Sequence, residues 1–446
     1  MSMNLIDPGY LHPLADAVLG HTPAALRASL SVASEDSTFL RFNHAQVRQA
    51  TQVSQGHATL MLSDGLRAAR ATHTLTGQRE TDALLLQEAM RALTDLLPGL
   101  PPDPHLMLPE RVCHTSCDAP GTLPDASEVI DTVAAHAGPH DFVGLYAGGP
   151  IVRFHADSRG QRNWHRAHTF AFDWCLYQSG DKAVKQHHAG SQWDGAQLAG
   201  KLQEGIAQLT LLAQPAITLK PGRYRAFFAP SAMAELLGTL AWGGFSHKEQ
   251  ALGTSPLSRL VQGEVSMHPS FNLREDTAGS ATPAFTADGF TRAPQVVLID
   301  QGRHAGSLCS PRSAREYGVA GNGASEGESP QALSLSPGAL REEDILPQLG
   351  TGLWISNLHY LNYSDRRQGR VTGMTRFACF WVENGQRVAP LNVMRFDDDL
   401  LTVLGERLIA LTDRAECFPD TSTYEARQLG AITTPGALVR NFELTL

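Results

Sequence analysis

The sequence lacks any long apolar run. Nowhere in its 446 residues is there a continuous apolar stretch of the roughly 18 residues that a membrane-crossing helix needs. The chain also lacks an excess of positive charge, and its net charge of −9 argues against a general nucleic-acid-binding role, which requires a basic face. The segment from Met1 to Gly20 has no basic stretch followed by an apolar core, so we expect no signal peptide.

Cysteine is scarce for a chain of this length. Six cysteines among 446 residues do not make a disulfide framework, and we therefore expect a reduced, cytoplasmic protein. Apolar residues make up 42% of the chain and charged residues 18%, which is ordinary for a globular protein. The length is sufficient for more than one hydrophobic core.

Helical and strand-like patterns both occur along the chain and predict an α+β fold of two domains. We expect an N-terminal sheet-and-helix domain over residues 1–214, with a further boundary at the proline-rich segment 98–124. A β-rich domain, opened by a helix, is expected over residues 215–446. In the first domain the patterns predict helices over 13–33, 81–97, 125–136 and 194–212, and strands over 37–43, 58–62, 66–74, 142–154 and 162–178.

The second half of the chain is expected to be mostly β-structure. Short apolar runs alternate with glycine, aspartate and proline, and they predict strands over 224–228, 295–299, 352–361, 376–382 and 438–446. One further helix is predicted over 399–412. The low-complexity segment 318–329 (GVAGNGASEGES) is expected to be a mobile loop.

The helix that opens this second half is the most informative segment. Ser231 is a plausible N-cap, the apolar residues that follow recur at helical spacing, and paired glycines end the pattern at Gly243. A zinc protease of the usual helical kind carries two histidines and a glutamate on one face of such a helix. Here Gly238, Thr239 and Gly243 stand on the corresponding face, so the sequence predicts no metal site on this helix.

Other segments contain residues capable of metal binding or catalysis, but their spacing does not favour either. Cys113 and Cys117 flank a histidine without the spacing of a zinc knuckle and without a second cysteine pair. In the His-rich region 164–188, His165 and His168 would point to opposite faces of a strand and cannot chelate jointly. A lone acid or base at His247 or Glu249, and a nucleophile at Ser255, lack activating partners in the sequence.

The segment 352–386 contains alternating strands that end in a hairpin signal. Strands of this kind accept an extended peptide by backbone pairing, and the alternative is that they are interior strands of a large sheet. The residues that we treat as peptide-binding candidates are Ile355, Asn357, His359, Tyr360, Thr372 and Arg376.

The order of these features resembles the TldD/PmbA (TldE) family across most of the chain. The similarity is carried by short motifs, each weak alone, that occur in the family's order: Arg41-Phe42-Asn43, Leu62-Ser63-Asp64-Gly65, Pro221-Gly222-Arg223-Tyr224, Ala229-Pro230, Glu235-Leu236-Leu237, Gly253-Thr254-Ser255, Leu358-His359-Tyr360, Thr372-Gly373 and Val382-Glu383-Asn384-Gly385.

The resemblance implies a specific place for this chain in the family. The catalytic subunit carries H-E-x-x-x-H directly after a Leu-Leu pair, and the ungapped register puts Gly238 and Gly243 at the histidine positions and Thr239 at the glutamate position. The family's third ligand, a cysteine, would fall near residues 421–423, and Cys417 lies a few residues away. The chain is therefore similar to the TldE (PmbA) subunit, which lacks the zinc motif.

The implied function is that of a non-catalytic subunit. We expect a cytoplasmic dimer with a TldD-like zinc metalloprotease subunit, in which the zinc belongs to the partner and the complex trims unfolded or extended peptides. No nucleic-acid or membrane partner is expected. Two alternatives stay open: a self-sufficient homodimer that binds peptides or regulates without proteolysis, and an enzyme that uses a different centre such as the His-rich region.

Overall fold

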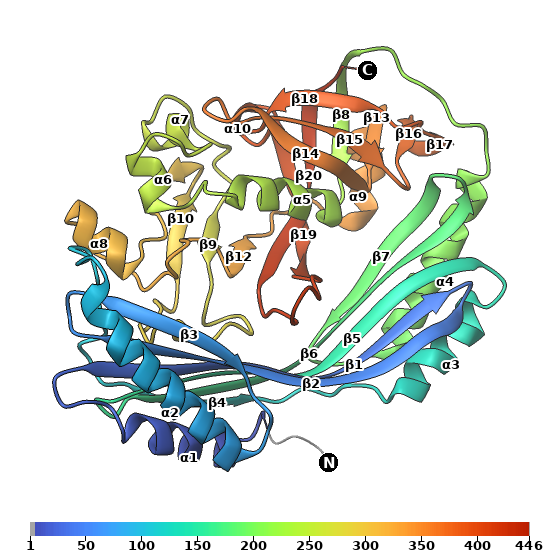
Figure 1. Cartoon of the computed structure of the whole chain (residues 1–446). Coiled ribbons are helices and arrows are strands. Elements are labelled where there is room, and N and C mark those ends of the chain that lie inside the picture. The colour runs from blue at the N-terminus through green and yellow to red at the C-terminus, as the bar shows by residue number, and fades with distance from the viewer. Residues whose placement is uncertain (1–4, 446) are drawn as a thin grey trace.

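The structure is a computed structural model, and it describes residues 5–445. Residues Met1–Asn4 lie outside the described part of the chain, and they begin the segment in which we expect no signal peptide. Leu446, the last residue of the strand expected over 438–446, also lies outside it. Two β-sheets dominate the molecule (Figure 1). Helices accompany both sheets, so the expected α+β fold class is confirmed.

The N-terminal half forms one curved sheet. The strand order is β3-β2-β1-β5-β6-β4, and β7 pairs with the second half of β6. The strands are β1 (Arg27–Asn43), β2 (Gln46–Ser63), β3 (Ala68–Thr74), β4 (His114–Ala119), β5 (Asp141–Asp157), β6 (Arg162–Ser179) and β7 (Lys182–Gly190).

Four helices cover the outer face of this sheet, the face turned away from the C-terminal half (Figure 1). They are α1 (Pro8–Leu19), α2 (Arg79–Leu96, followed by the 3-10 turn Leu97–Gly99), α3 (Ala126–Ala137) and α4 (Gly195–Leu212). The pair α1 and α2 buries one apolar cluster against the sheet, and the pair α3 and α4 buries another. The inner face of the sheet therefore remains for contacts with the C-terminal half.

The C-terminal half is built on a second, branched sheet with the main order β11-β10-β9-β12-β20-β8-β13-β16-β17. Its strands are β8 (Gly222–Phe228), β9 (Leu273–Glu275), β10 (Val296–Asp300), β11 (Arg303–His304), β12 (Ala332–Leu335), β13 (Gly352–Ile355), β14 (Asn357–Asp365), β15 (Arg370–Arg376), β16 (Phe380–Glu383), β17 (Gln386–Pro390), β18 (Arg395–Asp399), β19 (Leu408–Pro419) and β20 (Ala431–Leu444). Its helices are α5 (Pro230–Ala241), α6 (His247–Ala251), α7 (Ser258–Val261), α8 (Pro311–Tyr317), α9 (Glu342–Leu349) and α10 (Leu400–Val403).

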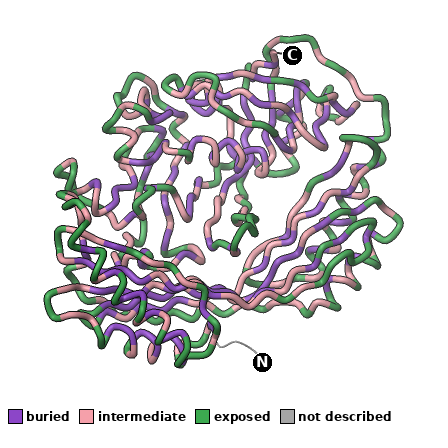
Figure 2. The backbone as a smooth tube through the Cα atoms, viewed as in Figure 1, coloured by how far each residue is buried: buried purple, intermediate pink, exposed green. Residues whose placement is uncertain are grey.

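The largest apolar cluster of the molecule lies in this second half, between its sheet and α5. Figure 2 shows buried residues concentrated in the sheets and on the helix faces that meet them, whereas exposed residues gather at the connections. No helix among residues 5–445 is long and apolar enough to cross a membrane.

Two predicted helices are wrong. The helix expected over 13–33 ends at Leu19, and Arg27–Asn43 is instead β1, which is hydrogen-bonded to β2 on one side and β5 on the other. The helix expected over 399–412 is limited to Leu400–Val403, and β19 begins at Leu408 because it pairs with β20. In both cases pairing with neighbouring strands of the sheet overrides the local helical preference.

The segment 318–329 is anchored near its end by buried contacts that its composition does not predict. Glu328 is 1% exposed, and its carboxylate accepts hydrogen bonds from the Ser246 hydroxyl at 2.7 Å and from the Ser310 backbone N–H at 2.7 Å. Ser246 and Ser310 are the N-caps of α6 and α8. One carboxylate thus joins the beginnings of two helices, a tertiary role that the glycine- and serine-rich sequence does not reveal.

Candidate functional site

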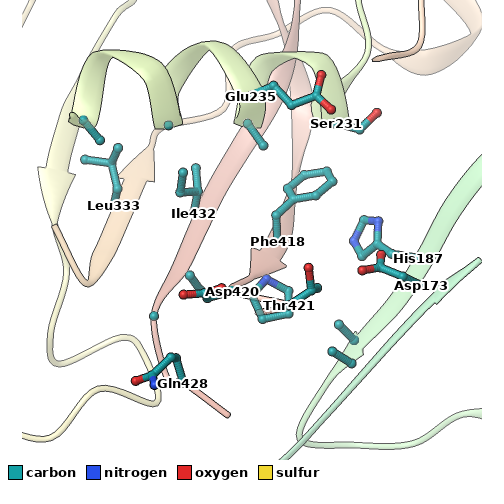
Figure 3. Close-up of a pocket in the computed structure, with 18 of the residues that line it drawn as sticks. Asp173, His187, Ser231, Glu235, Leu333, Phe418, Asp420, Thr421, Gln428 and Ile432 are labelled. Atoms are coloured by element: carbon teal, nitrogen blue, oxygen red, sulfur yellow. The ribbon is translucent and has the colours of Figure 1, made fainter. Parts of the chain in front are cut away.

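A cavity of about 760 Å³ lies between the two sheets (Figure 3). One wall is α5 with the first residue of β14, and the opposite wall is the inner face of β6 and β7. The loop that joins β19 to β20 (residues 420–430, the β19–β20 loop) contributes a third wall. We call this space the inter-sheet cavity.

The position of α5 follows from its amphipathic sequence. Pro230 occupies the first helical position, and Met233, Leu236 and Leu240 are fully buried against the C-terminal sheet. The Ser231 hydroxyl donates to the backbone carbonyl of Ser356 at 2.6 Å, which fixes the start of the helix to the β13–β14 connection. The other face of the helix, which lines the inter-sheet cavity, carries Ser231, Ala234, Glu235, Gly238, Ala241 and Trp242.

Glu235 is the one ionisable side chain that α5 directs to the cavity (Figure 3). Its carboxylate accepts a hydrogen bond from the Leu358 backbone N–H at 2.5 Å. Burial raises the pKa of Glu235 to about 7, and the Leu358 N–H, the Lys185 ammonium and the Asn357 side chain oppose this rise only in part. Glu235 is therefore poised to exchange a proton near neutral pH.

Sequence reasoning did not single out Glu235 as a site residue. The signal was visible, because it is the only aspartate, glutamate, lysine or arginine between Arg225 and Lys248. A single charge in a helix that is otherwise apolar indicates either a buried partner or a functional site.

The positions that would hold a metal in the resembled motif do not fit one. Gly238 has no side chain, and a Cβ added there would make only ordinary contact, 3.6 Å from Ile432 Cδ1. The Thr239 hydroxyl donates to the Glu235 backbone carbonyl at 2.9 Å. A Cβ on Gly243 would lie 2.5 Å from Nη2 of Arg366, and a guanidinium at this place repels a metal cation.

Arg366 is itself held at this place by backbone contacts. It donates to the carbonyls of Trp242 at 2.8 Å and of Thr254 at 2.9 Å. Among residues 5–445 no group of three or more His, Cys, Asp or Glu side chains is arranged to hold a metal ion. The donor set at this helix is therefore unsuited to zinc.

The opposite wall of the cavity carries Asp173, Lys185 and His187 on adjacent strands. Asp173 of β6 is registered with His187 of β7, and burial raises the pKa of Asp173. His187 Nε2 lies 3.2 Å from the Cys417 carbonyl oxygen, and burial lowers the pKa of His187 to about 4. His187 is thus neutral at physiological pH and connects β7 to the end of β19.

The peptide-binding candidates are distributed over different environments. Ile355 is fully buried in the core, so its side chain is not available to a peptide, and its carbonyl accepts from Ala229 N–H. Asn357 is 2% exposed and lines the inter-sheet cavity. His359 and Tyr360 are exposed on β14, which pairs only with β15 among the described strands and so has a free edge.

The remaining two candidates contribute to the sheet more than to the cavity. The Thr372 hydroxyl of β15 donates to the Phe396 carbonyl at 3.0 Å. Arg376 pairs with Asn357 in the β14–β15 register, and its guanidinium lies over the ring of Phe377. Only Asn357 of the six candidates lines the inter-sheet cavity.

The His-rich region and the cysteine pair form no common centre. His165 Nε2 lies 2.8 Å from the Ala281 carbonyl, and His168 Nδ1 lies 3.3 Å from the Ala119 carbonyl. His188 packs between the rings of Phe170 and Trp193 under α4. Cys117 of β4 is registered with His165 of β6, and Cys113 lies just before β4, whereas His187 and His188 of β7 pair with the other half of β6.

Comparisons with known proteins agree with this architecture. Residues 221–446 match the model of the PmbA/TldA metallopeptidase C-terminal domain. A search of curated protein sequences finds no match. The matched segment is half of the chain and contains the second sheet and α5, which places the chain in the TldD/PmbA class of proteins. We conclude that the chain belongs to the PmbA/TldD family.

Solved structures share the fold over nearly the whole chain at low sequence identity. TldE from Thermococcus kodakarensis has a TM-score of 0.77 at 14% identity, covering 98% of this chain and 100% of that one. A proposed modulator of a DNA gyrase from Thermotoga maritima has a TM-score of 0.73 at 13% identity, covering 98% and 99%. A proposed modulator of DNA gyrase from Bacteroides thetaiotaomicron has a TM-score of 0.70 at 15% identity, covering 98% of both chains.

Proposed function

We propose that this chain is the non-catalytic, TldE/PmbA-like subunit of a TldD-type zinc metalloprotease complex that trims unfolded or extended peptides. One observation supports the proposal: α5 lies beside the inter-sheet cavity and carries no metal-binding side chain at Gly238, Thr239 and Gly243, the positions that the resemblance assigns to the zinc motif of the family's catalytic subunit. The zinc and the water that it activates would belong to the partner. This chain would contribute the walls that receive the peptide.

The shape of the cavity supports a role in peptide binding. Its walls combine a helix, the β6–β7 face and the start of β14, and β14 has a free edge with exposed His359 and Tyr360. A free strand edge presents unpaired N–H and C=O groups that bind an extended chain regardless of its sequence. Folded proteins do not present such a strand, so the arrangement favours flexible peptides.

Reconstitution with a TldD-like subunit tests the proposal. The two purified chains should form a stable complex by light scattering, and cleavage of a fluorogenic peptide should require both. Zinc analysis should find the metal in the partner chain, and changing the glutamate of the partner's H-E-x-x-x-H motif should abolish cleavage. If the present chain alone binds one equivalent of zinc and cleaves the peptide, the proposal is wrong.

The same assay separates the two alternatives. A homodimer that binds the peptide but neither assembles with the partner nor supports cleavage would favour the self-sufficient binding protein. Alanine at His165, His168 and His188 should leave the cleavage by the complex intact in variants that retain the native circular dichroism. Loss of cleavage with retained fold would point to the His-rich region instead.

A further inference from the structure

One corner of the inter-sheet cavity contains hydrogen-bond acceptors that the chain itself leaves underused. Asn357 is 2% exposed, and its Oδ1 has no hydrogen-bond partner among residues 5–445. Beside it lies the Glu235 carboxylate, which accepts the Leu358 N–H and a hydrogen bond from the Asn357 side chain. We call Glu235 and Asn357 the acceptor corner.

Such a corner has an energetic cost when it is empty. A buried carbonyl oxygen without a donor loses its hydrogen bond to water, and a buried carboxylate with few donors resists ionisation. The raised pKa of Glu235 is the sign of that resistance. A ligand that brings N–H donors and positive charge would satisfy both groups at once.

Lys185 is the cation that the chain places in this cavity, and it acts on Glu235 through its charge. Lys185 lines the same cavity from the opposite wall, yet no ion pair within 4.0 Å joins it to Glu235 or Asp173 within residues 5–445. The ionisable side chains that line the cavity are Asp173, Lys185, His187, Glu235 and Asp420. With His187 neutral, one ammonium faces three carboxyl groups, and burial raises the pKa of two of them, Asp173 and Glu235, so a further cation would stabilise their ionised forms.

We propose that the acceptor corner binds a primary ammonium group of the peptide, either a lysine side chain or the N-terminal amine. The inference rests on the proposed function, because it assumes that extended peptides enter the inter-sheet cavity. An ammonium carries three donors on one small centre, which suits a carboxylate and the amide oxygen of a neighbouring side chain. A half-turn of the Asn357 amide replaces the nitrogen that donates to Glu235 by the oxygen, and the bound ammonium then supplies the donor to both groups.

The test measures the affinity of the full chain for three short peptides by calorimetry. The first is acetylated, amidated Ala-Ala-Lys-Ala-Ala, the second carries Nε-acetyl-lysine instead, and the third is penta-alanine amide with a free N-terminus. We expect the lysine peptide, the free-amine peptide or both to bind at least tenfold more tightly than the acetyl-lysine peptide. The ammonium peptide with the higher affinity shows whether the lysine side chain or the N-terminal amine is bound.

Variants assign that preference to the corner. Glu235→Gln should remove the preference by lowering the affinity for the ammonium peptide at least tenfold. Asn357→Ala should also lower the affinity for this peptide. Glu264→Gln, which removes an exposed carboxylate after α7, should leave it unchanged. The inference is overturned if the acetyl-lysine peptide binds as tightly as both ammonium peptides, or if no peptide binds at millimolar concentration. Both outcomes are measured on the unaltered chain, so they do not depend on whether a variant folds.

The result is independent of the test of the proposed function. A chain that supports cleavage with the partner but has no ammonium preference contradicts only the acceptor corner. A chain with the preference but no assembly contradicts only the subunit role.

Discussion

At the scale of single residues, Glu235 shows how a charge in an apolar helix acquires a role from distant parts of the chain. Its place in the sequence marks it as unusual, but its partner Leu358 lies 123 residues further along the chain. The sequence therefore reveals the anomaly and not its partners. Cavity-lining residues such as Asp173 and Lys185 could not be found in the same way, because only the pairing of β6 with β7 brings them to the α5 side.

The raised pKa of Glu235 predicts a pH-dependent stability. Below its ordinary pKa of 4.5 the carboxyl is protonated in both the folded and the unfolded state. As the pH rises from 4.5 to about 7, the unfolded chain releases the proton first, so the free energy of unfolding falls, and above pH 7 the loss is constant. Since one pKa unit is about 1.4 kcal/mol, we expect Glu235 to contribute a loss of roughly 3–4 kcal/mol.

Glu235→Gln should remove this contribution. Urea unfolding at pH 4.5 and pH 8 should show the variant gaining stability relative to the unaltered chain as the pH rises, while Glu264→Gln shows no such gain. A difference between Glu235→Gln and the unaltered chain that does not change with pH would contradict the assignment.

At the scale of elements, local patterns predicted α5 and α2 well because their helical spacing is strong and their ends carry proline or glycine. They failed for β1 and β19, whose strand conformation is set by pairing with other strands and not by a local apolar pattern. The register of α5 was also informative, since it placed Gly238 and Gly243 at the positions of a metal motif. What the register did not show is that Arg366 occupies the space beside Gly243.

Alanine should have opposite effects on stability at Gly238, inside α5, and at Gly243, just after its C-terminal end. Gly238 lies inside the helix with room for a methyl group, so Gly238→Ala should stabilise the protein by about 0.5–1 kcal/mol. Gly243 has φ +76° and its Cβ would displace Arg366, so Gly243→Ala should destabilise by about 1–2 kcal/mol or more. Urea unfolding of each variant measures both effects.

A third glycine isolates the cause. Gly253 has φ +69°, but a Cβ at this position would meet nothing within 4 Å, so Gly253→Ala should show the backbone cost alone. The excess cost at Gly243 then reports the displacement of Arg366 from the Trp242 and Thr254 carbonyls. Equal losses at Gly243 and Gly253 would show that Arg366 yields without cost.

At the scale of the whole molecule, the inter-sheet cavity depends on how the C-terminal half docks onto the N-terminal sheet. The β19–β20 loop makes this contact through Arg427, which is 6% exposed. Its guanidinium donates to the carbonyls of Gly149 at 3.1 Å and Thr169 at 2.7 Å and to the Ser37 hydroxyl at 3.1 Å. These residues belong to three strands of the N-terminal sheet, and no local sequence pattern relates them to Arg427.

Arg427 should therefore hold the β19–β20 loop against the sheet. Arg427→Ala removes three strand contacts and leaves buried acceptors without donors, so we expect a loss of about 2–4 kcal/mol in the free energy of unfolding. Hydrogen exchange across residues 420–430 should accelerate, because the loop loses its anchor while β19 and β20 remain paired. Arg427→Lys should recover little of the protection, since a single ammonium cannot reach three acceptors in the planar arrangement of a guanidinium.

Arg440→Ala is the matched control, because Arg440 is an exposed arginine on β20, and it should leave exchange in the loop unchanged. If exchange is also unchanged in Arg427→Ala, contacts other than those of Arg427 fix this wall of the cavity.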